Sequence, residues 1–475
     1  MRLLLYISII VFSFSTYGQE DVGGIFEEMP NDSLPKRTLK THSSLWPKVR
    51  ERNSSLGEDN FHFSPLVDLN FIQTTQSNFK TGLGIQLEGR IKNKFYYRLA
   101  GVEGISQTDG FYSPKTYIAD SNGQSSIYSD LHGRISFTPN PIFNFQVGLD
   151  NNFIGEGARS MFLSDYGASF PFGQIRMRFW RIEYSILYQF MREKDISPAT
   201  NRWNGKFSSS HHLSFNAAKW LNIGFFETVI FQPKDTLSNR GFEVEYLNPF
   251  IFYRPQEYSL GSSDNVLIGV ELNAFWKKHT FYSQFIMDEF VLSEIKNKTG
   301  WWASKYGGQF GVKGRFNRGE NKFFYRLEYN FARPYTYAHI SRELNYGNQG
   351  TPLAHPYGAS FMELLGEFKW QNNKMYAKIF SNYYLRGAST NGFNYGENIY
   401  DPYINRPYEY GHFIGQGKGY NGTKTILTFG YQVLKNGNLN AFVENHFNAS
   451  TIDKKIHYNF VVGLRSMLWN DRRNY

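Results

Sequence analysis

Hydrophobic and polar residues alternate along this chain with a period of two, in many short segments. In "NKFFYRLEYNFARP" (321–334), one row of alternate positions is Phe323, Tyr325, Leu327, Tyr329 and Phe331, and the other is Phe324, Arg326, Glu328, Asn330 and Ala332. A period of two predicts a β-strand, because successive side chains of a strand point to opposite faces. An aromatic-rich apolar face opposite a charged face suits a soluble sandwich. It also suits a membrane barrel whose apolar face meets lipid.

The connections between these predicted strands fall into two length classes. Short connections lie at 93–95, 138–141, 180–182, 217–220, 276–279, 317–321, 371–374 and 435–438. Long segments rich in Gly, Asn, Ser and Tyr lie near 105–126, 152–172, 193–208, 232–263, 291–305, 333–358, 385–423 and 448–456. Short turns at one rim and long loops at the other are typical of an outer-membrane barrel, whose short turns face the periplasm.

The hairpins around the short connections set the expected size of the barrel. A first strand near 62–72 and a last strand near 458–469 complete the set. The sequence therefore predicts an all-β fold, a transmembrane antiparallel β-barrel of about 18 strands with periplasmic termini.

Two further strands assign each row of side chains to a side of the barrel wall. In 265–276 the apolar row is Val266, Ile268, Val270, Leu272, Ala274 and Trp276, with Glu271 and Asn273 in the other row. In 361–370 the apolar row is Met362, Leu364, Gly366, Phe368 and Trp370, with Glu363, Glu367 and Lys369 in the other. A Lys or Arg on the lipid face near the bilayer centre costs roughly 2–4 kcal/mol, so we expect the charged rows to face a hydrated lumen. Trp276 and Trp370 lie beside short turns, where an aromatic girdle is expected.

The first part of the chain is expected to serve export. Residues 1–18 have a positive start, a short apolar core and small residues before a cleavage point, which predicts a secretory signal peptide. Residues 19–60 are polar and predict a short periplasmic segment, and 61–475 form the predicted barrel. The chain has no cysteine, which excludes disulfides and a lipoprotein anchor.

Composition and charge agree with a barrel. Aromatic residues make up 18% of the chain, yet the mean hydropathy is −0.48, which alternation explains because half of each strand faces water. The net charge of +10 comes from basic residues scattered singly along strands, which argues against a nucleic-acid partner. The remaining interpretations are pairing with nearby carboxylates inside the barrel, or contact with acidic glycans and lipopolysaccharide phosphates at an outer membrane.

Three segments are more patterned than plain loops: 148–172 ("GLDNNFIGEGARSMFLSDYGASFPF"), 245–272 ("EYLNPFIFYRPQEYSLGSSDNVLIGVEL") and 347–368 ("GNQGTPLAHPYGASFMELLGEF"). With the export signal and the strand count, they resemble the capsule assembly Wzi family of outer-membrane barrels. Within it they are similar to the Bacteroidetes branch, which includes gliding-motility proteins of the RemB type. The resemblance covers most of the chain after about residue 60.

This resemblance implies long extracellular loops that occlude the lumen and a non-catalytic role in holding or organising surface or capsular polysaccharide. For the gliding branch it implies a component of motility or adhesion. The capsule-binding relatives carry a helical periplasmic region before the barrel, whereas this chain has only the polar segment 19–60 there. That departure puts contact with a capsule export channel in doubt.

The three segments supply the candidate site residues. Their side chains combine aromatic faces with carboxylate, amide and basic groups, which suits sugar rings and their hydroxyls: Glu156, Arg159, Asp165, Tyr246, Asn248, Tyr253, Arg254, Glu257, Asp264, Asn265 and His355. The structural alternative is that these loops pack into the lumen and close it with Arg–carboxylate pairs. That alternative is favoured for any single residue, while the loops as a set favour a binding surface, because function concentrates on long loops held by a rigid scaffold.

The sequence predicts no enzyme, cofactor or metal site. His211 and His212 are adjacent on a predicted strand, so they point to opposite faces and cannot ligate one metal together. Besides the polysaccharide-binding barrel, two functions stay open. One is a porin-like uptake channel, which this strand number also fits. The other is a surface scaffold for partner proteins of motility or secretion.

Overall fold

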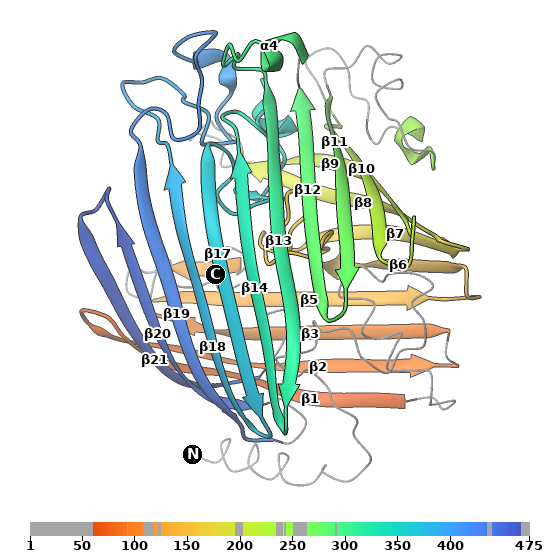
Figure 1. Ribbon diagram of the computed structural model, residues 1–475. Helices are drawn as coiled ribbons and strands as arrows, with labels where there is room; N and C mark the ends of the chain where they lie inside the picture. Colours follow the sequence, from red (N-terminus) through yellow and green to blue (C-terminus); the bar gives the residue numbers. More distant parts are fainter. Residues whose placement is uncertain are drawn as a thin grey trace.

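The computed structural model describes residues 60–92, 94–107, 117–121, 125–194, 203–233, 241, 244–249, 264–289, 292–434 and 439–466. The predicted signal peptide, nearly all of the segment 19–60 and the chain end from 467 lie outside these ranges. Within them the chain forms a large antiparallel sheet that curves into a closed barrel (Figure 1). The sheet has 19 strands, of which the short β4 pairs only with β5, and the other 18 close the ring through β1 and β21. The predicted fold class is confirmed.

The strands are β1 (Asn60–Gln73), β2 (Ser77–Ile91), β3 (Phe95–Ser106), β4 (Tyr117–Ser121), β5 (Ser126–Phe137), β6 (Phe143–Asp150), β7 (Phe170–Phe179), β8 (Ile182–Lys194), β9 (Trp203–Phe215), β10 (Leu221–Phe231), β11 (Asn265–Trp276), β12 (His279–Glu289), β13 (Lys305–Arg318), β14 (Asn321–Ala332), β15 (Gly347–Asn348), β16 (Thr351–Pro352), β17 (Phe361–Asn372), β18 (Met375–Arg386), β19 (Tyr420–Gln432), β20 (Asn440–Ser450) and β21 (Lys455–Arg465). The helices are η1 (Val244–Leu247), α4 (Leu292–Lys296), η2 (Arg342–Leu344) and η3 (Tyr403–Asn405). In the described part of the chain, none of them has the length and apolar character that crossing a membrane requires.

Every predicted short connection joins two consecutive paired strands, as expected. The expected long loop at 448–456 is wrong, because β20 continues to Ser450 and β21 begins at Lys455, which leaves a four-residue turn. The first two strands are also joined by a tight turn, at 74–76. The connections at the long-loop rim are therefore short on both sides of the seam where β1 pairs with β21.

The two rows of β14 face opposite sides of the wall as predicted. Leu327 is 52% exposed on the outside, whereas its neighbour Glu328 is 1% exposed on the inside. Outward rows of exposed Phe, Leu, Ile and Tyr recur around the ring, which is the surface that a transmembrane barrel presents to hydrocarbon.

Replacing Leu327 by arginine is expected to lower the free energy of unfolding by about 2–4 kcal/mol, because the charge would sit near the bilayer midplane. Met375, at the start of β18 and 56% exposed, is the matched control. Met375→Arg is expected to cost only about 0–1 kcal/mol, because it lies close to the short-turn rim. Urea unfolding in lipid vesicles measures both values, and equal costs would contradict the assignment of the outer row to hydrocarbon.

The expectation of a hydrated lumen is wrong for the part of the barrel toward the long loops. Inward-facing Phe226, Leu267 and Ile286 are at most 2% exposed there. They belong to an apolar core that combines further inward side chains of the strands with Ile399, Tyr400 and side chains of the segments 151–169 and 333–360. These segments bring their own apolar side chains into the barrel, so the inner row at this level meets protein instead of water.

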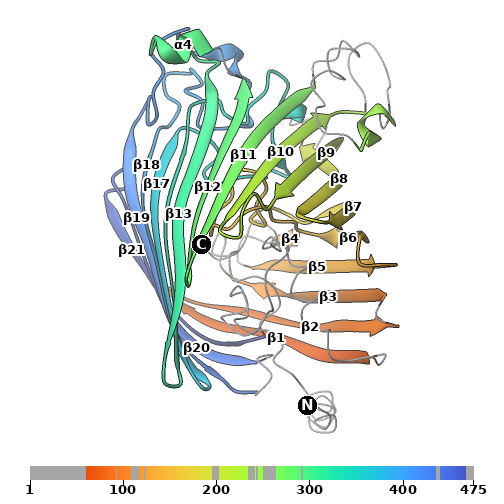
Figure 2. The same cartoon turned by 45° about the vertical axis from the view of Figure 1, so that its right-hand side comes forward.

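The described residues 244–249, which include η1, do not enter the lumen. The short lime-green helix η1 lies outside the ring of strands, beside β9 and β10, in Figures 1 and 2. Tyr246 of this helix packs against Phe231 and Val266, which belong to the outward rows of β10 and β11. The placement of this part of 245–272 differs from the expected occlusion of the lumen.

Candidate functional site: a luminal plug and an aromatic rim

Two segments fold into the barrel and contact each other there, and we call 151–169 and 333–360 together the plug. They are joined through backbone groups, with the Ser164 amide donating to the Leu353 carbonyl at 2.7 Å. Two buried tyrosine hydroxyls of the second segment donate to carbonyls of the first: Tyr337 to Met161 at 2.8 Å and Tyr346 to Phe162 at 2.7 Å. Because the carbonyl groups of the first segment have partners in the second, the two segments form one body.

Apolar contacts fix the plug to the wall. Phe162 is fully buried and stacks on Phe226 of β10, with ring centroids 4.8 Å apart. Gly269 of β11 faces the same ring, and a Cβ there would lie 2.4 Å from a Phe162 ring carbon. The wall therefore has a glycine where the Phe162 ring packs against it.

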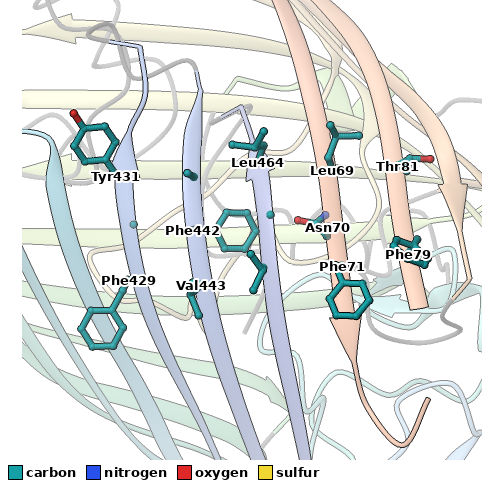
Figure 3. Close-up of a pocket in the computed structure, with 14 residues that line it drawn as sticks. Leu69, Asn70, Phe71, Phe79, Thr81, Phe429, Tyr431, Phe442, Val443 and Leu464 are labelled. Atoms are coloured by element: carbon teal, nitrogen blue, oxygen red, sulfur yellow. The ribbon is translucent and has the colours of Figure 1, made fainter. Parts of the chain in front are cut away.

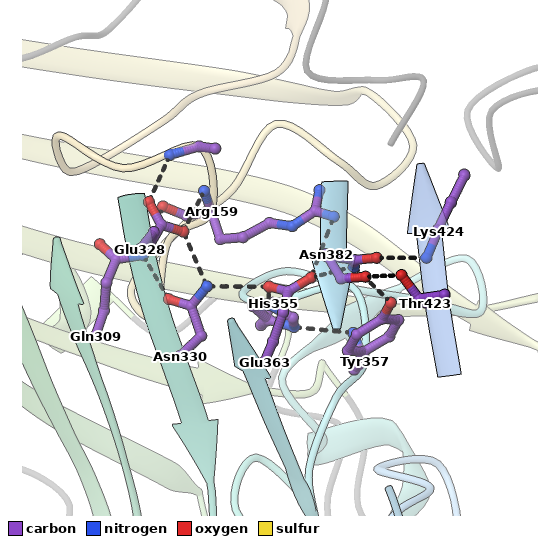
Figure 4. A network of polar contacts seen from close by, with 11 residues as sticks. Arg159, Gln309, Glu328, Asn330, His355, Tyr357, Glu363, Asn382, Thr423 and Lys424 are labelled. Atoms are coloured by element: carbon purple, nitrogen blue, oxygen red, sulfur yellow. Dashed lines mark hydrogen bonds and ion pairs between the residues drawn. The ribbon is translucent and has the colours of Figure 1, made fainter. Parts of the chain in front are cut away.

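A buried polar network holds the plug at the β17 side (Figure 4). Glu363 of β17 is fully buried and lies 2.8 Å from His355 Nε2 of the plug. It also accepts hydrogen bonds from Asn330 at 3.0 Å and Asn382 at 2.6 Å. The Arg159 guanidinium lies 3.6 Å from the same carboxylate. Glu363 thus joins both plug segments to the wall.

A second carboxylate binds the main chain of the plug. Glu328 of β14 accepts hydrogen bonds from the amides of Ala158 at 2.8 Å and Arg159 at 3.2 Å. Gln309 of β13 donates to the Arg159 carbonyl at 3.0 Å. Lys313 forms an ion pair with Glu156 at 2.6 Å. The charged inner rows of the strands therefore position the plug.

The structure brings some of the sequence-predicted residues together and separates others. Glu156, Arg159 and His355 lie in the plug network described above, and buried Asp165 also lies in the plug, where its carbonyl accepts a hydrogen bond from Asn151 at 2.9 Å. Asn265 donates to the Leu344 carbonyl of the plug at 2.9 Å.

The other candidates lie away from the plug. Tyr246 and Asn248 belong to the segment on the outer wall, where the Tyr246 hydroxyl donates to Asp264 at 2.7 Å. Tyr253, Arg254 and Glu257 lie outside the described residues.

A second feature, which the sequence analysis did not single out, lies at the long-loop rim. We call its side chains the aromatic rim: Trp301, Trp302, Tyr403, Ile404, Tyr408, Tyr410 and Phe413. Ile404, Tyr410 and Phe413 are 64%, 56% and 60% exposed. Exposed apolar side chains gathered on one rim are typical of interaction sites on proteins. The sequence signal was the density of aromatic residues in "DPYINRPYEYGHF" (401–413).

Backbone hydrogen bonds fix the aromatic rim. The Trp302 amide donates to the Glu409 carbonyl at 3.0 Å, and the His412 amide donates to the Gly300 carbonyl at 2.8 Å. Gly300 has a φ of 67°, and a Cβ there would lie 2.8 Å from the His412 amide nitrogen. Only glycine suits both the left-handed conformation and the close approach of the two loops.

Cations lie on the rings of the rim. The Arg406 guanidinium lies 4.3 Å from the Trp302 ring centroid, and Lys305 Nζ lies 4.3 Å from that of Tyr403. Burial, followed by the charges of Glu289 and Asp288, raises the pKa of Tyr403 to about 12. Burial, followed by the charge of Lys305, lowers the pKa of His339 to about 4. Both groups are therefore neutral at pH 7, and the two cations are paired with carboxylates, Arg406 with Glu409 and the buried Lys305 with Glu289.

Within the described residues, no group of three or more His, Asp or Glu side chains is placed to hold a metal ion. The inward His212 lies 3.3 Å from Glu271, while His211 faces outward, so the predicted separation of these two histidines is confirmed. The chemistry that the plug and the rim support is hydrogen bonding, ion pairing and ring packing.

No family model and no curated relative matches the sequence. Among solved structures, the chain is similar to Wzi, an outer-membrane protein involved in group 1 capsule assembly in Escherichia coli and described as a carbohydrate-binding β-barrel. The TM-score is 0.57 at 13% identity, over 88% of this chain and 86% of that one. OpdK of Pseudomonas aeruginosa, solved with vanillate, gives a TM-score of 0.48 at 8% identity, over 86% and 99%. OprD of the same organism gives 0.44 at 9% identity, over 86% and 94%. At these identities the likeness to Wzi establishes a shared barrel fold, as the resemblance of the sequence predicted.

Proposed function

We propose that this protein is a non-enzymatic outer-membrane barrel that binds surface or capsular polysaccharide at the aromatic rim. Its short turns and both termini face the periplasm, and its long loops face the cell exterior. The observation that carries this proposal is the combination of a lumen filled by a hydrogen-bonded plug with a fixed, exposed aromatic surface above it. Wzi, whose fold is similar, is described as carbohydrate-binding, which supports the same class of ligand here.

The chemistry of the rim suits a saccharide. Flat aromatic rings combine an apolar face with polar edges, and they pack against the C–H faces of sugar rings. Arg406 places hydrogen-bond donors beside the Trp302 face, whereas Lys305 is fully buried beneath the Tyr403 ring. Loops fixed on a rigid barrel hold such groups in place before binding, which reduces the entropy lost on binding. The plug residues Glu156, Arg159, Asp165 and His355 act in closing the lumen in this proposal.

Replacing Trp302 by alanine is expected to weaken oligosaccharide binding about tenfold, or about 1.4 kcal/mol, because the ring supplies a contact face and supports Arg406. Intrinsic tryptophan fluorescence, titrated with fragments of the cell's own surface polysaccharide, measures the affinity. Trp276, 59% exposed at the short-turn end of β11, is the control, and Trp276→Ala is expected to leave binding unchanged. No saturable response in the unaltered protein would contradict the proposal.

The resemblance to the gliding-motility branch adds a cellular role to this proposal. We propose that the bound polysaccharide serves surface attachment during movement, with motility or secretion proteins as further partners. Deleting the gene and scoring capsule retention and cell spreading in parallel tests this role. Loss of capsule alone would favour the capsule function, and normal capsule with impaired spreading would favour motility.

A further inference from the structure

A pocket of about 450 Å³ lies on the outer wall, at the long-loop end of β18, β19, β20 and β21. One row of outward side chains, in register across these strands, forms its floor and sides: Tyr383, Thr423, Ala449 and Ile456. Tyr383 and Ile456 stand at the two ends of the row and are 54% and 77% exposed, whereas the side chains between them are small. The pocket therefore exists because two small residues separate two large ones over about 14 Å of wall.

Small side chains continue from this pocket toward the short turns. Ser381 and Thr425 occupy the next outward row, and their hydroxyl oxygens lie 2.8 Å apart in a hydrogen bond. The Thr423 hydroxyl donates to the Asn382 carbonyl at 2.8 Å. Because these hydroxyls have partners inside the wall, hydrocarbon can cover them without leaving a polar group unpaired. The path below the pocket therefore suits an extended acyl chain.

The pocket lies at the boundary of the membrane-spanning wall. Tyr431, 47% exposed, marks the short-turn end of β19, and Asn421, which lines the pocket, lies about 33 Å away along the same strand. With the usual strand tilt of about 35–45°, that path rises about 25 Å, which equals the height of the apolar band of an outer-membrane barrel. In the orientation proposed above, on which this inference rests, this end of the wall meets the headgroups of the outer leaflet.

Two cations line the pocket at this boundary. Lys454 and Lys455, in the connection between β20 and β21 and at the start of β21, are both exposed. Within the part of the chain that the structure describes, neither of them forms an ion pair. Asp453 beside them is also exposed, so two lysines against one aspartate leave a net charge of +1. A ligand in this pocket therefore meets a positive charge above an apolar floor.

We propose that this pocket binds a phosphorylated glycolipid of the outer leaflet. The acyl chains lie on the small-residue floor between Tyr383 and Ile456, and a phosphate group meets Lys454 and Lys455. Charge complementarity selects this occupant, because lysines beside an apolar membrane surface recognise anionic lipid headgroups. The pocket shares no residue with the aromatic rim, so this binding is independent of polysaccharide binding there.

A second groove on the outer wall supplies a comparison. It measures about 680 Å³ and crosses the closing seam between β1 and β21 (Figure 3). Phe71, Phe429 and Leu464 stand along it with 36%, 58% and 38% of their surface exposed. None of the described residues that line this groove carries a charge. The groove offers apolar contact without cations, and it therefore separates phosphate recognition from general contact with lipid.

Neutralising the two lysines tests the charge. The purified protein is titrated with diphosphorylated lipid A in detergent micelles, and native mass spectrometry counts the bound lipid. The double variant Lys454→Gln, Lys455→Gln is expected to bind about thirtyfold more weakly, equivalent to about 2 kcal/mol for two lysines beside an anionic headgroup. Lys277 and Lys278 form a matched exposed pair in the short turn between β11 and β12, and Lys277→Gln, Lys278→Gln is expected to leave binding unchanged. Equal losses from the two double variants, or no loss from the first, would overturn the proposal.

Filling the pocket tests the apolar floor. Thr423→Trp places a large ring between Tyr383 and Ala449, and it is expected to weaken lipid binding about tenfold, equivalent to about 1.4 kcal/mol. Thr81 is an exposed threonine of the seam groove, and Thr81→Trp is the matched control, expected to leave binding unchanged. Binding that Thr423→Trp leaves intact, or that both variants weaken equally, would count against this pocket.

Varying the ligand tests the headgroup. Lipid A without its phosphate groups is expected to bind the unaltered protein about thirtyfold more weakly than the diphosphorylated form. Inorganic phosphate at the same concentration is expected not to displace the lipid, because it makes no contact with the apolar floor. Equal affinity for the two forms of lipid A, displacement by inorganic phosphate, or displacement by fragments of the surface polysaccharide would each contradict a glycolipid site.

Discussion

Replacing Glu363 by alanine is expected to lower the free energy of unfolding by about 3–5 kcal/mol, the usual cost of removing one member of a buried ion pair. Glu363 is fully buried and accepts hydrogen bonds from both the plug and the wall. Its removal leaves the buried Arg159 charge without that carboxylate at 3.6 Å. Urea unfolding in detergent micelles, followed by tryptophan fluorescence, measures the change.

The controls for this variant separate charge from general perturbation. Glu320 is exposed in the turn between β13 and β14, and Glu320→Ala is expected to change the free energy of unfolding by less than about 0.5 kcal/mol. Glu363→Gln keeps the side-chain shape and an acceptor oxygen, so an intermediate loss is expected. A loss for Glu363→Ala no larger than for Glu320→Ala would contradict the role of this carboxylate in holding the plug.

Truncating Phe162 to alanine is expected to cost about 3–5 kcal/mol in the free energy of unfolding, through lost apolar burial and the cavity left behind. The ring is fully buried between Phe226 and the Gly269 surface of the wall. The same unfolding measurement applies, with Phe310→Ala as the matched control, because Phe310 is 56% exposed on the outer wall of β13. If the two alanine variants lost equal stability, the plug would not be packed as described.

Much of the barrel could be predicted from the sequence because its signal is local. The alternation of Leu327 and Glu328 assigns each residue to a face without any knowledge of distant parts of the chain. The short turns fix which strands pair, and both features hold in the structure.

The individual contacts of the plug and the outer-wall position of η1 could not be predicted, because they depend on contacts between distant segments. The stretch "FFETVIF" (225–231) of β10 is apolar in both rows except for Glu227 and Thr228, which gives no clear inner and outer face. The reason is visible only in the fold: Phe226 packs on the plug, and Phe231 packs on Tyr246 of η1. The sequence analysis expected the patterned segments to occlude the lumen, which holds for 151–169 and 333–360. It does not hold for the described part of 245–272 with η1, because no local pattern tells which side of the wall a loop will cover.

The candidate site was anticipated in part for the same reason. Glu156, Arg159 and His355 were selected for their polar chemistry, and the structure joins them to the wall carboxylates and lysine of the inner rows. The aromatic rim was missed because its rings converge from 292–304 and 385–419, which no local pattern connects.

Single-channel recording of the purified protein in a planar lipid bilayer tests the central claim, a transmembrane barrel closed by its own plug, most directly. The account predicts insertion with no steady open current from the unaltered protein, and the appearance of current when Phe162 and Glu363 are both truncated to alanine. A large, steady conductance from the unaltered protein would contradict the closed lumen and favour an uptake channel.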